Sequence, residues 1–179
     1  ATPGPAAAPG LNLATRLNQR RFAELAALSL TLTDRYPDNV LGWSMLAIAL
    51  RSQGQAMAAI EPMRRVAEFT PANVDNLNQL GLALADVGEL IESEVCFRKA
   101  IGIDPSLTWG HSNLGMVLQR QGRLAQAEEC FRRCIELDES FHVAHLNLSV
   151  VLDELGQPEQ ALASVRRALE IRPDFAQAH

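Results

Sequence analysis

The chain has 179 residues, 47% hydrophobic and 21% charged, values that are ordinary for a globular protein of one domain or one repeat array. Sixteen basic and 21 acidic residues give a net charge of −5 without any basic cluster, which argues against nucleic-acid binding. No apolar run approaches the roughly 18 residues of a membrane-spanning helix, and no signal peptide is recognisable. These features predict a cytoplasmic protein that neither binds nucleic acid nor spans a membrane.

The first ten residues, ATPGPAAAPG, contain only Ala, Thr, Pro and Gly, and they predict a flexible linker over 1–10. The rest of the chain repeats every 34 residues, with several kinds of position recurring in register. The columns are Pro37, Pro71, Pro105 and Pro173 (with Glu139 in the missing slot); Gly54, Gly88, Gly122 and Gly156; Leu46, Leu80, Leu114 and Leu148; the small residues Ala47, Gly81, Gly115 and Ser149, and Ala59, Ser93, Ala127 and Ala161; and the large residues Met63, Phe97, Phe131 and Val165. So many columns in register predict a tandem repeat.

Each unit contains two stretches of about 13 residues whose apolar side chains follow helical spacing, for example about 108–121 and 124–137 in the third copy. The glycine between the stretches is expected to end the first helix, and the proline near the end of the unit to stop the second. The small residues would let the two helices of a hairpin approach closely. Pro62 falls inside a second helix and predicts a kink between Ala58 and Pro62.

The pattern resembles the tetratricopeptide repeat family. The matching residues are Trp43, Leu46, Ala47, Leu50, Ala59 and Pro71 in one copy, and His111, Leu114, Gly115, Leu118, Ala127 and Phe131 in the best copy. The resemblance implies an all-α, right-handed superhelical solenoid of antiparallel helix-turn-helix repeats. The expected divisions are a degenerate repeat at 11–39, full repeats at 40–73, 74–107, 108–141 and 142–175, and the start of a further helix at 176–179. In the degenerate repeat, the first helix is expected within 11–19 and the second after it.

Functional residues are expected in the columns that packing leaves free on the first helix of each unit, which lines the concave side of such an array. The predicted peptide-binding residues are Met45, Ile48, Asn78, Gln79, Leu82, Trp109, Asn113, Met116, Arg120, Asn147 and Val150. Gln79, Asn113 and Asn147 form a column of amides, which can pair with any peptide backbone. These amides could equally serve only to solvate the surface, and Trp109 could pack on the preceding loop instead of anchoring a ligand.

No metal, cofactor or catalytic site is predicted. The histidines His111, His145 and His179 share one repeat column, one per hairpin, and are poorly placed to converge on an ion. Three cysteines are too few for a disulfide framework, and no CxxC motif or histidine pair joins Cys130 and Cys134 in a zinc site. There is no phosphate-binding loop and no nucleophile elbow. The sequence therefore favours a protein without enzymatic activity.

The predicted function is a protein- or peptide-binding scaffold that uses its concave face. Arg51 and Arg120 are too isolated to form the basic clamp with which chaperone-linked members of the family hold a terminal carboxylate. One alternative is the substrate-recruiting arm of a larger enzyme, because HSNLGMVLQRQGRLAQAEECFRRCIEL resembles the repeats of O-linked N-acetylglucosamine transferases. There Asn113 and Asn147 match an asparagine ladder, Gln79 approximates it and Met45 breaks it. Another alternative is self-association through the uncapped apolar face of 158–171 at the C-terminal end.

Overall fold

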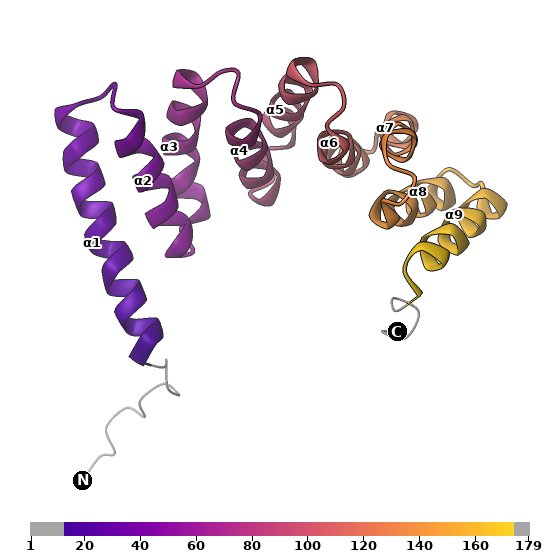
Figure 1. Cartoon of the computed structure of the whole chain (residues 1–179), viewed down its shortest axis with the longest axis horizontal. Helices are drawn as coiled ribbons and strands as arrows, with labels where there is room; N and C mark the ends of the chain where they lie inside the picture. The colour runs from indigo at the N-terminus through magenta and orange to yellow at the C-terminus, as the bar shows by residue number, and fades with distance from the viewer. Residues whose placement is uncertain (1–12, 174–179) are drawn as a thin grey trace, which may run out of the picture. The chain divides into compact units, whose positions relative to one another are not determined.

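The computed structural model describes residues 13–173, and its elements there are α-helices (Figure 1). The helices are α1 (Leu13–Arg35), α2 (Val40–Ser52), α3 (Ala56–Phe69), α4 (Val74–Asp86), α5 (Leu90–Ile103), α6 (Thr108–Arg120), α7 (Leu124–Leu137), α8 (His142–Glu154) and α9 (Pro158–Ile171). The predicted linker at 1–10 and the predicted restart at 176–179, including His179, lie outside the described residues. The helices from α2 onward begin and end within a residue or two of the positions that the repeat predicts.

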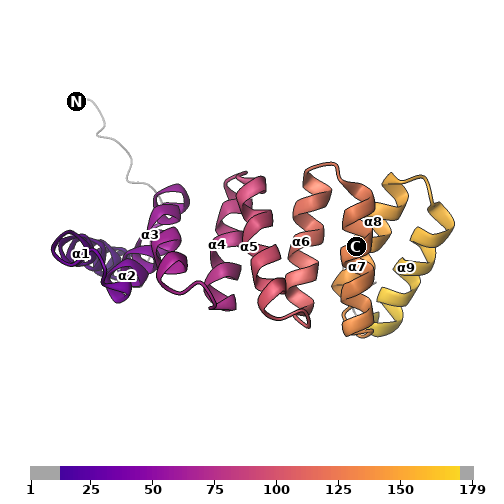
Figure 2. The same cartoon turned by 90° about the horizontal axis from the view of Figure 1, so that it is seen from above.

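The chain divides into two compact units, residues 1–69 with α1 to α3 and residues 70–179 with α4 to α9. In the second unit the hairpins α4–α5, α6–α7 and α8–α9 pack one after another (Figure 2). The first helices also touch each other, α4 with α6 and α6 with α8, whereas α5, α7 and α9 make no such contact among the described residues. The first helices are therefore the more closely spaced row, and we call their free side the inner face of the second unit.

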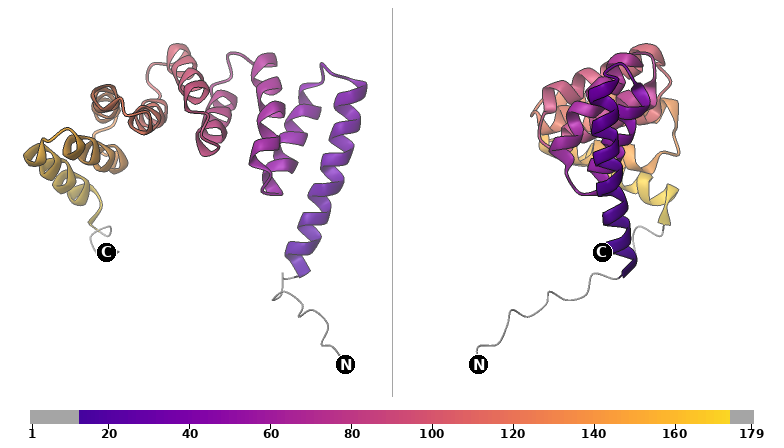
Figure 3. Two further views of the ribbon diagram at one scale, coloured as in Figure 1. Left: turned by 180° about the vertical axis from the view of Figure 1, so that it is seen from behind. Right: turned by 90° about the vertical axis from the view of Figure 1, so that its left-hand side faces the viewer.

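The first unit contains one long helix where the sequence predicted two. α1 runs without a break over 23 residues, packs on α2, and α2 packs on α3 (Figure 3). The prediction of a separate first helix within 11–19 is wrong for the described part of that segment. The physical reason is that residues 11–36 contain no glycine or proline, so nothing in the chain ends the helix once it has begun.

The glycine column ends the first helix of each hairpin, as predicted. Gly54, Gly88, Gly122 and Gly156 all have positive φ, between 74° and 89°, which an L side chain rarely adopts. At Gly122 the hydrogen bonds are those of a Schellman motif, because Gly122 N–H donates to Gln119 O at 2.8 Å and Arg123 N–H donates to Leu118 O at 2.9 Å. The glycine thereby reverses the chain and satisfies carbonyls that the helix end would leave without donors.

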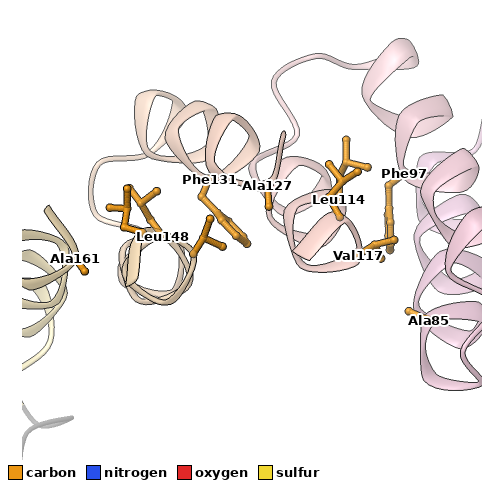
Figure 4. Close-up of a cluster of buried hydrophobic side chains, with 11 residues drawn as sticks. Ala85, Phe97, Leu114, Val117, Ala127, Phe131, Leu148 and Ala161 are labelled. Atoms are coloured by element: carbon orange, nitrogen blue, oxygen red, sulfur yellow. The ribbon is translucent and has the colours of Figure 1, made fainter. Parts of the chain in front are cut away.

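The core of the second unit depends on aromatic rings that lie against glycines. A Cβ atom on Gly115 would lie 2.7 Å from Cε1 of Phe131, and one on Gly81 would lie 2.8 Å from Cζ of Phe97. Both rings are fully buried, among the leucines and alanines drawn in Figure 4. The predicted close approach of the two helices in a hairpin is thus confirmed in the described hairpins α4–α5 and α6–α7. Pro62 does not end α3, which continues to Phe69, and the expected kink stays a prediction.

Candidate functional site

The column that holds aromatic residues in the family ties α2, α6 and α8 to the loops before them, whereas α4 has Leu77 at this position. Trp43 Nε1–H donates to Pro37 O at 2.7 Å, and the ring nitrogen Nε2 of His111 and of His145 lies 3.1 and 3.2 Å from the carbonyl oxygens of Pro105 and Glu139. Since a carbonyl oxygen only accepts, both histidines must carry their proton on Nε2 in this bond. The two histidines therefore bond to the preceding loop as the tryptophan does. This bond explains their presence without a metal.

The amides of the inner face are arranged differently from the predicted column of Gln79, Asn113 and Asn147. Asn113 Nδ2 donates to Asn78 Oδ1 at 2.9 Å, which joins α6 to α4, whereas Gln79 is exposed. Asn147 occupies the matching place on α8, but its Nδ2 is buried with no acceptor among the described residues. The residue that would correspond to Asn78 in that pair is Ser112, whose side chain is shorter. The structure thus brings Asn78 and Asn113 together and leaves Asn147 outside the ladder.

An apolar stripe runs beside these amides, at one position of each inner helix. It consists of Leu82 on α4, Met116 on α6 and Val150 on α8. Met116 and Val150 remain 37% and 49% exposed, and Leu82 is partly buried against the core. Trp109 also packs partly buried against that core, so much of its ring area serves the fold. The stripe is the accessible apolar surface that the predicted site residues form in the second unit.

The C-terminal turns of the inner helices carry most of the charge on this face. Arg120 donates through Nη1 to Ala85 O at the end of α4, at 2.7 Å, and Gln119 Nε2 donates to Glu154 Oε1 on α8, also at 2.7 Å. Asp86 and Asp153 are exposed in the same turns, and their carboxylates bond to no described residue. We call Asp86, Asp153 and Glu154 the acidic edge. The predicted peptide-binding residues do not include them, because the sequence alone is explained by solvated carboxylates on an exposed face.

In the first unit, the predicted residues lie on α2. Met45 is partly buried, and Ile48 is 56% exposed. Ile48, Arg51 and Ser52 line a shallow depression of about 350 Å³. Gln53 Nε2 donates to Phe22 O at 3.0 Å and fastens the end of α2 to α1, just as Gln121 Nε2 donates to Leu90 O at 3.1 Å and fastens α6 to α5. The glutamine is therefore a recurrent tie between hairpins rather than a ligand-binding residue.

The second unit has a depression of its own, where α5, α6 and α7 meet. It has a volume of about 380 Å³, and its lining includes Arg98, His111 and Cys130. Burial raises the pKa of the Cys130 thiol to about 11, and burial together with the carboxylate of Asp138 raises that of Cys134 to about 12. Both thiols are neutral at physiological pH, and a neutral thiol is a poor nucleophile and a poor metal ligand. The depression therefore offers no activated group.

The described histidines, cysteines and carboxylates form no group of three or more that could hold a metal ion. No described helix has both the length and the apolar character needed to cross a bilayer.

Models of a known family match the repeats. One family model described as "Tetratricopeptide repeat" matches residues 106–174, and another with the same description matches 74–107, so that together they span more than half of the chain. No curated protein sequence matches the chain significantly.

Solved structures are similar in fold at low sequence identity. A crystal structure of MamA has a TM-score of 0.78 at 18% identity, covering 94% of this chain and 99% of that one. MamA 41-end from Desulfovibrio magneticus RS-1 has a TM-score of 0.75 at 13% identity, covering 95% and 100%. YrrB, described as a TPR protein with an unusual peptide-binding site, has a TM-score of 0.77 at 18% identity, covering 89% and 84%. With its repeats matched by the family models and its helices arranged as in these solenoids, this chain belongs to the tetratricopeptide repeat family.

Proposed function

We propose that this protein is an interaction scaffold that binds an extended peptide segment of another protein on the inner face of its second unit. The observation that carries the proposal is the apolar stripe, whose Met116 and Val150 stay exposed on helices that are otherwise packed against their neighbours. Exposed apolar side chains in a row, flanked by polar groups, are typical of binding surfaces.

The groups beside the stripe suit a peptide backbone. The bond between Asn113 and Asn78 uses one hydrogen of the Asn113 amide, which leaves an N–H and an oxygen of that amide for a ligand. Inner helices that pack together have axes about 8–10 Å apart. A peptide extended as a polyproline II helix has three residues per turn and advances about 3.1 Å per residue, so every third side chain, about 9 Å from the last, would face the stripe. The solenoid of YrrB, which is similar in fold and has a peptide-binding site, is in keeping with this assignment.

The proposal includes no catalytic role and no cofactor. The described histidines of the repeat column are engaged with loop carbonyls, and the pKa values of Cys130 and Cys134 are raised. Recruitment of substrates for a glycosyltransferase and self-assembly are the alternatives, and no feature of the described surface favours either over peptide binding. The three cysteines are free thiols, which fits the reducing cytoplasm that we propose as its location.

The experiment is selection of random linear peptides on the full chain, followed by affinity measurement with a fluorescent copy of the best peptide. The double variant Met116→Gln/Val150→Thr makes the stripe polar with little change in volume, and we expect it to weaken binding about tenfold or more. The control is Ile91→Gln/Leu162→Thr, which changes apolar residues that are 79% and 51% exposed on the second helices α5 and α9. Equal loss of binding in both variants, or no selected peptide at all, would contradict the proposal.

A further inference from the structure

The acidic edge consists of carboxylates at positions where a helix disfavours them. Asp86 is the last residue of α4, and Asp153 and Glu154 are the last two of α8. The helix dipole places partial negative charge at the C-terminus, so this turn ordinarily favours a cation. Asp75, in the first turn of α4, is by contrast where a carboxylate is favoured. Helix stability therefore explains Asp75 and does not explain the acidic edge.

The carboxylates of the acidic edge form no ion pair with any described residue of the second unit. Asp86 and Asp153 make no ion pair or hydrogen bond with any described residue, and the partner of Glu154 is Gln119, which is neutral. The one guanidinium in these turns of the unit's inner helices, that of Arg120, donates to the carbonyl of Ala85. Three carboxylates against this one guanidinium leave the edge with a net negative charge, one helical turn beyond the apolar stripe on α4 and α8.

We propose that the inner face of the second unit selects basic segments, namely extended peptides whose aliphatic side chains lie on the apolar stripe while their Lys or Arg side chains reach the acidic edge. This rests on the proposed function and specifies the chemistry of the partner. The distance along each helix supports it, since Val150 and Asp153, like Leu82 and Asp86, are three or four residues apart and share one face. A long basic side chain that leaves an extended backbone at the stripe can span one helical turn while its apolar stem stays on protein surface.

The experiment analyses the peptides selected on the full chain and measures their affinity for a charge-reversed variant, Asp86→Lys/Asp153→Lys. Lysine in the last turn of a helix is favoured by the dipole, so this variant is expected to keep its fold, which circular dichroism checks. Glu139→Lys is the control, because that carboxylate is also exposed but lies in the loop between α7 and α8. We expect enrichment of Lys and Arg beside aliphatic residues, about tenfold weaker binding by the double variant, and much less change with the control.

Raising the salt concentration to about 0.5 M should weaken binding to the unmodified chain and should have less effect on the charge-reversed variant. Selected peptides that are neutral or acidic, yet lose affinity with Met116→Gln/Val150→Thr, would overturn this inference and leave the proposed function intact. Peptides that bind independently of the stripe would overturn both.

Discussion

At the scale of single residues, the fold depends on side chains that are absent. Gly115 and Gly81 are buried on inner helices, and the rings of Phe131 and Phe97 approach to within 2.7 and 2.8 Å of where a Cβ atom would be. The same repeat column holds Ala47 and Ser149 in the other copies, where the large partner column holds the smaller Met63 and Val165. The volumes of the two columns thus compensate each other, as close packing requires.

This compensation predicts that Gly115→Ala lowers stability, although alanine is the better helix former. The new methyl group would meet Phe131 at 2.7 Å, and relieving that overlap should cost about 1–3 kcal/mol. Gly102→Ala is the matched control, because Gly102 is also helical but a Cβ there meets nothing within 4 Å. Alanine at 102 should stabilise by up to about 1 kcal/mol. Urea denaturation of both variants tests the pair, and a neutral or stabilising Gly115→Ala would contradict the packing argument.

A second residue-scale prediction concerns the thiols. Since burial raises the pKa of Cys130 to about 11 and that of Cys134 to about 12, both should react slowly with Ellman's reagent at pH 8 in the native protein and quickly in urea. The folded protein holds these protons more tightly than the unfolded chain, whose thiols titrate near 8.5. Stability should therefore fall as pH rises from about 9 towards 12. Native labelling as fast as in urea would show that the thiols are accessible.

At the scale of elements, neighbouring hairpins are held by side chains that cross from one to the next. Glu94 on α5 is only 13% exposed, accepts from Arg98 at 2.8 Å, and pairs with Arg123 in the turn between α6 and α7 at 2.6 Å. Partial burial alone would raise its pKa, but hydrogen bonds from Arg98, Gln121 and Arg123 outweigh burial and lower it. One carboxylate thus fixes the second helix of one hairpin to the turn of the next.

Replacement of this carboxylate should loosen the two hairpins. Glu94→Gln keeps the shape but removes the charge-assisted bonds, and we expect a loss of about 1–3 kcal/mol at neutral pH. The lowered pKa of Glu94 means that its contribution is present above the pKa of an unfolded glutamate and is lost as pH falls through its folded value. The difference between native and variant stability should accordingly shrink in acid. Equal differences at neutral and acid pH, measured by urea denaturation, would contradict this role.

The repeat predicted the helices well because the residues that end them act locally. Glycine at 122 ends a helix whatever surrounds it, so the bounds of α6 and α7 followed from the sequence. The single helix α1 was missed because the repeat pattern was extended to this segment, although it has no glycine or proline to end a first helix. At the candidate site, the column of Met116 and Val150 was predicted from spacing alone. The bond between Asn113 and Asn78 was not, because it depends on side-chain length and on a stagger between neighbouring helices.

At the scale of the molecule, a repeat array is held by contacts between neighbours, so its parts can be stable separately. The second unit contains three complete hairpins and one continuous core from Ala85 to Ala161. Three repeats are about the minimum that buries a continuous core. The first unit has a smaller core around Ala26, Leu46 and Ala49.

We therefore expect a fragment of residues 70–179 to fold without the first unit. Its circular dichroism should be helical, and its melting should be cooperative, because the core cluster of the second unit lies entirely within it. The fragment also holds the apolar stripe and the acidic edge, so its Kd for the best selected peptide should lie within about threefold of that of the full chain. A fragment of residues 1–69 is the matched control and should not bind that peptide. A folded 70–179 fragment with much weaker affinity would contradict the placement of the peptide site within the second unit.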